Sequence, residues 1–163
     1  MLITRLTKVA MCFALGLFCL LVAFDNIFDY GTNYTFVQHV LSMDTTFPNN
    51  VLKGRAITSP TLWTIAYWSI IAAEAVTGLL LALATLRLAV AVRGPASDFN
   101  AAKQLVVLGM GLGFLLWFTG FAVVGGEWFA MWQSKEWNGV PSAFRFYVTL
   151  LLVLIFVMQR DSD

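Results

Sequence analysis

TLWTIAYWSIIAAEAVTGLLLALATL, from Thr61 to Leu86, is the stretch that decides the fold of this chain. It carries one charged side chain, Glu74, in a run long enough to cross a bilayer as an α-helix. At about 100° per residue, Gly78 and Ala82 fall on the same side of that helix as Glu74. Because faces of small residues pack against neighbouring helices, the stretch predicts a membrane bundle with a carboxyl group inside it.

The composition also indicates a membrane protein. Of the 163 residues, 60% are hydrophobic and 12% are charged, and the mean hydropathy is +0.79. Soluble domains carry about 25% charged residues. The formal net charge is +1 and the sequence has no basic patch, so we expect the lipid bilayer as a partner and no nucleic acid. We predict a single integral membrane domain over residues 1–163.

Four apolar segments are long enough to span the membrane. The first also has the outline of a secretory signal, but Leu21-Val22-Ala23 is a poor cleavage site, so we interpret it as a retained helix. The prediction is an all-α, four-helix transmembrane bundle. Its helices are predicted at about 8–28, 61–87, 103–124 and 140–159.

Local signals mark the ends of these helices. Ser59-Pro60 predicts the start of the second helix, with Ser as N-cap and Pro at the first helical position. Gly94-Pro95 predicts its end. Gly125-Gly126 predicts a hinge after the third helix, followed by an aromatic segment at the membrane interface.

The long outer loop between helices 1 and 2 is expected to carry a short interfacial helix. The pattern over Tyr34 to Met43 has the period of an amphipathic helix, which is typical of a helix lying on the membrane surface. Its apolar stripe consists of Phe36, Val37, Val40 and Leu41.

The distribution of Lys and Arg predicts that both termini are cytoplasmic. Cytoplasmic loops are enriched in these residues, and this orientation places six of them on the cytoplasmic side and three on the outer side. The six on the cytoplasmic side are Arg5, Lys8, Arg87, Arg93, Lys103 and Arg160. The three on the outer side are Lys53, Arg55 and Lys135.

Small residues recur at helical spacing on three of the predicted helices, which indicates faces where helices approach closely. The two cysteines among them are seven residues apart, about 10 Å along a helix, which is too far for a disulfide. The predicted packing residues are Cys12, Gly16, Cys19 and Ala23 on the first helix, Gly78 and Ala82 on the second, and Gly109, Gly113 and Gly120 on the third.

Glu74 and Arg145 are predicted to form a buried ion pair. Counting back from Arg87 and Arg160 places both groups at nearly the same depth below the outer boundary. An ion pair would offset part of the cost of burying each charge. We interpret the pair first as a structural lock and second as a titrating site on a proton or ion path through Glu74.

A polar cluster is expected on the outer face, and it could supply ligands for a metal. Two carboxylates four residues apart and an imidazole are plausible ligands, but the spacing is unspecific, and solvated side chains are the default interpretation. We therefore expect no metal, and we expect no cofactor, because the single histidine cannot provide two haem ligands. The cluster consists of Asp25, Asn26, Asp29, His39, Glu127 and Trp128.

Two segments rich in polar and aromatic residues resemble a known family. They are FDNIFDYGTNY and FVQHVLSMDT within 24–45, and GEWFAMWQS, WNG and AFR within 126–145. The family consists of predicted small bacterial integral membrane proteins classed as a domain of unknown function, and the resemblance covers nearly the whole chain. It implies a four-helix protein of the bacterial inner membrane and brings no activity with it.

These observations lead to an expected function without catalysis. No serine or cysteine has a base at a recognisable spacing, so we do not expect an enzyme, and a lipid-modifying enzyme ranks third. The first expectation is an accessory or scaffold subunit that contacts other membrane subunits or a second copy of itself. The alternative is a small proton- or ion-coupled translocator that uses Glu74.

Overall fold

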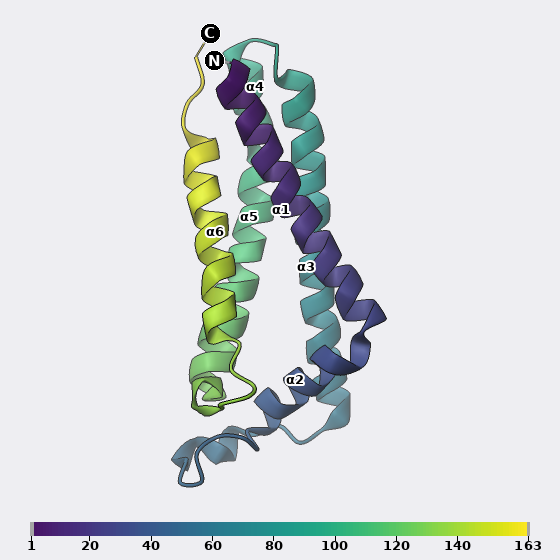
Figure 1. Cartoon of the computed structure of the whole chain (residues 1–163), viewed down its shortest axis with the longest axis vertical. Coiled ribbons are helices and arrows are strands. Elements are labelled where there is room, and N and C mark those ends of the chain that lie inside the picture. The colour runs from purple at the N-terminus through teal and green to yellow at the C-terminus, as the bar shows by residue number, and fades with distance from the viewer. Residues whose placement is uncertain (1, 163) are drawn as a thin grey trace.

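The computed structural model describes residues 2–162 as a bundle of four long helices (Figure 1). The N- and C-terminal segments lie at the same end of the bundle, which we call the terminal end, and the opposite end is the loop end. No strand is present within residues 2–162. The predicted all-α, four-helix fold is confirmed. The four helices long and apolar enough to span a membrane are α1 (Leu2–Phe28), α3 (Pro60–Ala91), the continuous stretch Ala96–Trp128, and α6 (Val140–Met158).

The third span consists of three successive helices. They are α4 (Ala96–Ala102), α5 (Gln104–Phe114) and η2 (Leu115–Trp128), a π-type helix that is wider than an α-helix. The predicted hinge at Gly125-Gly126 is wrong, because the helix runs through both glycines. The chain turns instead at Ala130, which has a φ of 52°.

The buried glycines of this region allow close packing. A Cβ atom on Gly125 would lie 3.2 Å from Cε of Met131, which belongs to the short helix η3 (Met131–Gln133). A Cβ on Gly126 would lie 3.1 Å from Val140 at the start of α6. These glycines therefore let η3 and α6 fold back onto the third span.

The predicted helix of the long loop is present as α2 (Tyr30–Ser42), and it begins four residues before the predicted start. Asp29 interrupts the helical backbone between α1 and α2, with φ −103° and ψ 51°, and its carboxylate accepts a 3.0 Å hydrogen bond from the hydroxyl of Thr32. The left-handed Met43 ends α2. After it come η1 (Val51–Arg55) and α3, which begins at Pro60 as predicted.

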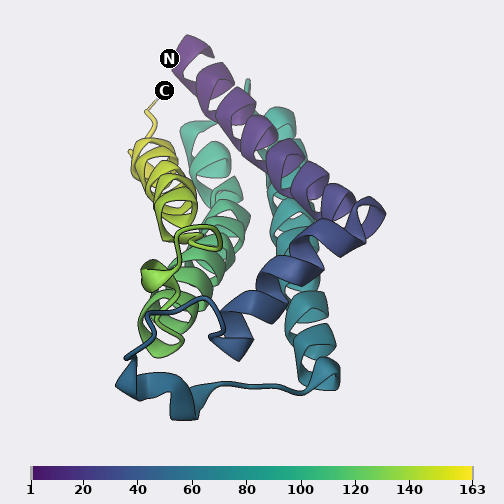
Figure 2. The ribbon, with the colours of Figure 1, turned by 60° about the horizontal axis from the view of Figure 1, so that its bottom comes forward.

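The long helices are closest at the terminal end and separate towards the loop end. α3 packs on α1 and α5, and α6 packs on α5 and η2. Near the loop end, α3 diverges from η2, and α2 crosses the space between them (Figure 2). The bundle is therefore splayed at one end and α2 fills the opening.

α2 contacts a different part of the bundle with each half. Its first half places Val37 against Tyr67 and Ile71 of α3, and its second half places Val40 among Phe129 and Met131. Val37 and Val40 belong to the predicted apolar stripe. The stripe therefore faces the bundle, because the splayed helices expose apolar surface that α2 covers.

Most of the predicted packing residues lie between helices. Cys12, Gly16, Cys19 and Ala23 form the buried face of α1, and the two cysteines are free thiols. Added Cβ atoms would lie 2.7 Å from Leu20 at Gly78, 2.9 Å from Leu81 at Gly109 and 2.8 Å from Leu150 at Gly113. Ala82 is half-buried against Gly16. Gly120 differs from the others, because it is exposed and a Cβ added to it would have no atom of another helix within 4 Å.

Candidate functional site

Glu74 lies on the buried face of α3, and its side chain belongs to a hydrogen-bonded chain that joins three helices. The Nδ2 atom of Asn26 in α1 donates a 2.7 Å bond to Oε2 of Glu74. Asn33 of α2 donates a 2.7 Å bond to Oδ1 of Asn26. The hydroxyl of Tyr67 donates a 2.8 Å bond to the backbone oxygen of Asn26. Glu74 is only 2% exposed, so this chain holds a carboxyl group inside the bundle.

The predicted ion pair between Glu74 and Arg145 is wrong. Asn26 takes the place of the arginine at Glu74, and Arg145 is exposed and donates a 3.0 Å bond to the hydroxyl of Ser142. Trp117 and Phe146 line both the cavity that contains Glu74 and the groove beside Arg145, so these two rings separate the groups. Depth along a helix can be counted from sequence, whereas the direction in which a side chain points around the bundle depends on packing.

The predicted outer-face cluster does not assemble. Asn26 alone among its members faces the bundle interior, whereas Asp25, Asp29 and Glu127 are exposed. His39 lies 2.8 Å from Oδ2 of Asp44 and stacks on Trp137. Trp128 stacks with the guanidinium of Arg55 at 4.4 Å. Within residues 2–162, no three His, Cys, Asp or Glu side chains are grouped as metal ligands.

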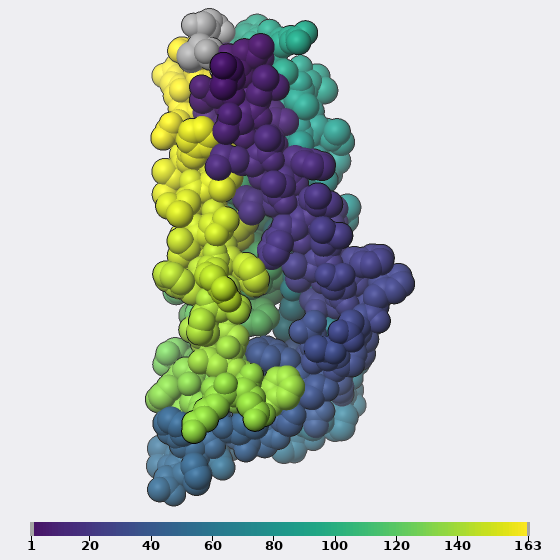
Figure 3. Space-filling view, viewed as in Figure 1, coloured from purple at the N-terminus to yellow at the C-terminus, as the bar shows by residue number. Residues whose placement is uncertain are grey.

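A cavity of about 310 Å³ surrounds the inner side of Glu74, and we call it the Glu74 cavity. Its polar lining comes from Glu74, Asn26, Asn33, Asn138 and Ser142. Its aromatic lining comes from Phe36, Trp117, Phe121 and Phe146, together with Tyr67. In the space-filling view the surface is hollowed between α6 and the corner of α1 and α2, the elements that line this cavity (Figure 3).

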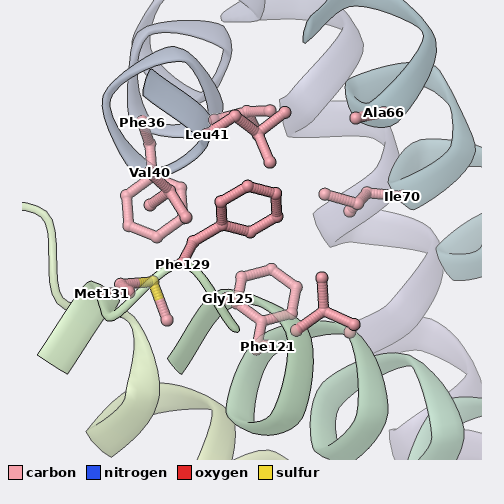
Figure 4. Close-up of a pocket in the computed structure, with 12 residues that line it drawn as sticks. Phe36, Val40, Leu41, Ala66, Ile70, Phe121, Gly125, Phe129 and Met131 are labelled. Atoms are coloured by element: carbon pink, nitrogen blue, oxygen red, sulfur yellow. The ribbon is translucent and has the colours of Figure 1, made fainter. Parts of the chain in front are cut away.

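A second cavity, of about 190 Å³, lies next to the first and is lined by apolar residues throughout. It is enclosed by α2, α3 and η2 near the loop end, and Figure 4 shows the ring of Phe129 pointing between Leu41 and Phe121. Phe36 and Phe121 line both cavities. The two spaces are therefore neighbours separated by side chains rather than by a helix.

The terminal end contains a buried ionic cluster that the sequence did not predict. The Nζ atoms of Lys8 and Lys103 lie 2.7 Å and 2.5 Å from the same carboxylate oxygen, Oδ2 of Asp161. Both lysines also donate to the backbone oxygen of Gln159. Asn100 exchanges two hydrogen bonds with the backbone of Asp161. The cluster joins α1, the α4–α5 junction and the segment after α6.

The environment of Asp161 shifts its acid strength. Burial raises the pKa of this carboxyl group, but the hydrogen bonds and charges of Lys103 and Lys8 outweigh burial, and the net effect is a pKa below the usual value. Asp161 is only 4% exposed and both lysines are at most 2% exposed. The cluster therefore behaves as a structural lock with an ionised aspartate.

A family model of a predicted small integral membrane protein (DUF2165) matches residues 4–160. The chain belongs to this DUF2165 family. It is therefore a small integral membrane protein, and the resemblance noted in the sequence is confirmed. No curated protein and no solved structure matches the chain.

The two segments that carry the resemblance to DUF2165 proteins meet at the Glu74 cavity. Asn26, Asn33 and Phe36 come from the first segment, and Asn138 and Gly139 come from the second. Sequence reasoning singled out Asn26 as an outer polar residue, although it bonds directly to Glu74. Its position two residues before the end of an apolar helix was the available signal.

Asp161 is the residue that sequence reasoning missed most clearly. It follows the last span in a short acidic segment, which is typical of a solvated tail. Lys8 inside the first apolar segment and Lys103 at the start of the third were the available signals, because each needs an anion or water near the membrane boundary.

Proposed function

We propose that this protein is a non-catalytic accessory or scaffold subunit of a bacterial inner-membrane complex, with both termini in the cytoplasm. A scaffold needs a preformed surface that keeps its shape without the partner. The ionic cluster at the terminal end and the α2 packing at the loop end support such rigidity.

The observation that carries this proposal is a set of exposed apolar side chains at the loop end, in the loops and at the last residue of the third span. Phe47, Val51, Trp128 and Trp132, which we call the loop-end apolar surface, are between 50% and 94% exposed. Exposed apolar groups in the middle of a span contact lipid, whereas groups in the loops or at the end of a span favour a protein partner or the membrane interface.

Hydrogen bonds fix the segments that carry this surface. The backbone N–H of Phe47 donates to the side chain of Gln133 at 3.0 Å, and the hydroxyl of Thr45 donates to that of Ser134 at 2.9 Å. Arg55 donates to the backbone oxygen of Trp128. Long-range bonds between two loops restrict their motion, which lowers the entropy cost of binding a partner.

Photo-crosslinking in bacterial membranes at native expression level tests the proposal. We expect a photoreactive residue at Val51 or Trp132 to give one reproducible protein adduct, and residues at the exposed span positions Leu83 and Leu152 to give lipid adducts. Val51→Glu should abolish both the adduct from Trp132 and co-purification in mild detergent. Lipid adducts from all four positions, with a lone monomer after purification, would contradict an accessory role.

The orientation is supported by the six Lys and Arg residues that cluster around the terminal end. Ser162→Cys and Lys53→Cys, in a variant without the two native cysteines, place one thiol at each end of the bundle. An impermeant maleimide should label the Lys53 position in whole cells and the Ser162 position only after the inner membrane is permeabilised. The reverse pattern would mean that the termini face outward.

A translocator is the second candidate, and the observation that favours it is the presence of Glu74 in a cavity. Between Glu74 and the terminal end, however, the core contains the apolar side chains of Leu81, Leu88 and Met110, each at most 1% exposed. An ion would therefore need these helices to separate. Glu74→Gln should abolish flux in proteoliposomes if the protein is a translocator, and unchanged flux would exclude a path through Glu74.

A further inference from the structure

We propose that the Glu74 cavity is a binding site for an organic cation, an ammonium compound with apolar substituents. The site combines one buried carboxylate with aromatic walls contributed by α2, η2 and α6. This inference is separate from the accessory role, because it needs the cavity and does not need the loop-end apolar surface.

The carboxylate supplies the charge for such a ligand. No Lys, Arg or His nitrogen of residues 2–162 lies within ion-pair distance of Glu74, and the cavity lining includes no such residue. Oε2 of Glu74 accepts the bond from Asn26, and no described residue donates to Oε1. A cation in the cavity would therefore provide the counter-charge that the protein does not provide.

The aromatic lining favours an organic cation over a metal ion. Phe36, Trp117, Phe121 and Phe146 line the same space as Glu74, and aromatic faces attract ammonium groups through the negative charge of their π-systems. The affinity of a site for a divalent metal ion rises with the number of charged ligands, whereas Glu74 is the one acidic side chain in the lining and the other oxygen-bearing side chains there are neutral. The chemistry of the walls therefore fits a cation with a low hydration energy.

The size of the cavity limits the ligand. A water molecule occupies about 30 Å³ of the liquid, so the cavity of about 310 Å³ has room for about ten non-hydrogen atoms. The neighbouring apolar cavity shares Phe36 and Phe121 with it, so rotation of either ring would admit an apolar substituent. The ammonium group would then lie at Glu74 and the apolar part near Phe129 (Figure 4).

Calorimetric titration of the purified protein with benzyltrimethylammonium tests this proposal. We expect saturable binding, and we expect none of benzenesulfonate, an aromatic anion of similar size. Glu74→Gln should weaken binding of the cation by at least about tenfold, because it removes a buried charge partner while keeping the side-chain shape. Glu127→Gln is the matched control, since it makes the same change at an exposed position, and it should leave the affinity unchanged.

A second pair of variants keeps the proposal testable if Glu74→Gln does not fold. Phe146→Leu removes an aromatic wall of the cavity and should weaken binding about three- to tenfold, whereas Phe144→Leu changes an exposed ring on the same helix and should have no effect. The proposal is overturned if the unmodified protein shows no saturable binding of the cation. It is also overturned if a folded Glu74→Gln variant, or Phe146→Leu, binds the cation as tightly as the unmodified protein.

Discussion

The side-chain amide of Asn26 in α1 donates a 2.7 Å hydrogen bond to the carboxylate of Glu74 in α3. The two residues are separated by 48 positions in the sequence, and both are less than 10% exposed. A neutral amide thus stabilises a carboxyl group where an arginine was expected. Among residues 2–162 no cation lies within ion-pair distance of Glu74, so a bound cation could supply the counter-charge.

Removing this hydrogen bond should destabilise the bundle. Asn26→Ala leaves the buried carboxyl group of Glu74 without its donor and should lower the free energy of unfolding by about 1–3 kcal/mol. In a Glu74→Leu background the same substitution should cost less, since the carboxyl group is gone. Unfolding in mixed micelles gives the free energy of unfolding of the unmodified protein, the two single variants and the double variant. Equal costs in the two backgrounds would show that the bond contributes nothing to stability.

Asp161→Asn should destabilise the terminal end strongly. The substitution leaves Lys8 and Lys103 buried without a counter-charge, and breaking a buried ion pair from one side costs about 3–5 kcal/mol. Asp98→Asn, at an exposed aspartate near the same end, is the control and should change stability by less than about 0.5 kcal/mol. Thermal unfolding of the two variants in the same detergent makes the comparison.

Acid should weaken the same lock. The pKa of Asp161 is lower in the folded protein than its usual value, so the folded state favours the ionised form. The ionised carboxylate contributes fully to the free energy of unfolding above the pKa of an aspartate in the unfolded chain, about 3.9. This contribution is lost as the pH falls through the lower pKa that Asp161 has in the folded protein. The stability difference between the unmodified protein and Asp161→Asn should therefore shrink below about pH 4. A difference that stays constant to lower pH would argue against an ionised Asp161.

Gly78→Ala should separate α1 from α3. The added Cβ would lie 2.7 Å from the side chain of Leu20 and 3.0 Å from its backbone nitrogen, and backbone cannot move aside as a side chain can. We expect a loss of about 1–3 kcal/mol, as for other overpacked sites. Gly111→Ala meets no atom within 4 Å and should be neutral or stabilising by up to about 1 kcal/mol. Measuring both variants by the same unfolding assay separates crowding from helix propensity.

The sequence predicted the features of the fold that depend on composition and local period. The four spans follow from apolar length, the start of α3 follows from Ser59-Pro60, and the buried face of α1 follows from the spacing of Cys12 and Gly16. The helix in the long loop also follows from its apolar period. Each of these features is decided within one segment of the chain.

The sequence failed where two segments had to be placed relative to each other. Glu74 and Arg145 were matched by depth, but the rotation of α6 turns Arg145 away from the cavity. Asp161 has no partner that the local sequence reveals, because its two lysines come from segments far away in the sequence. Gly125 and Gly126 predicted a hinge, whereas in the structure their lack of a side chain lets Met131 and Val140 pack closely against the helix.

The cluster of Lys8, Lys103 and Asp161 has a consequence for biogenesis. Its three members come from the first turns of the first span, the start of the third span and the segment after the fourth, so they meet only when every span has been inserted into the bilayer. Until then the two lysines lack Asp161 as a counter-charge. The ion pairs of these lysines with Asp161 would therefore form only after the last segment has been synthesised, when all four helices are in place.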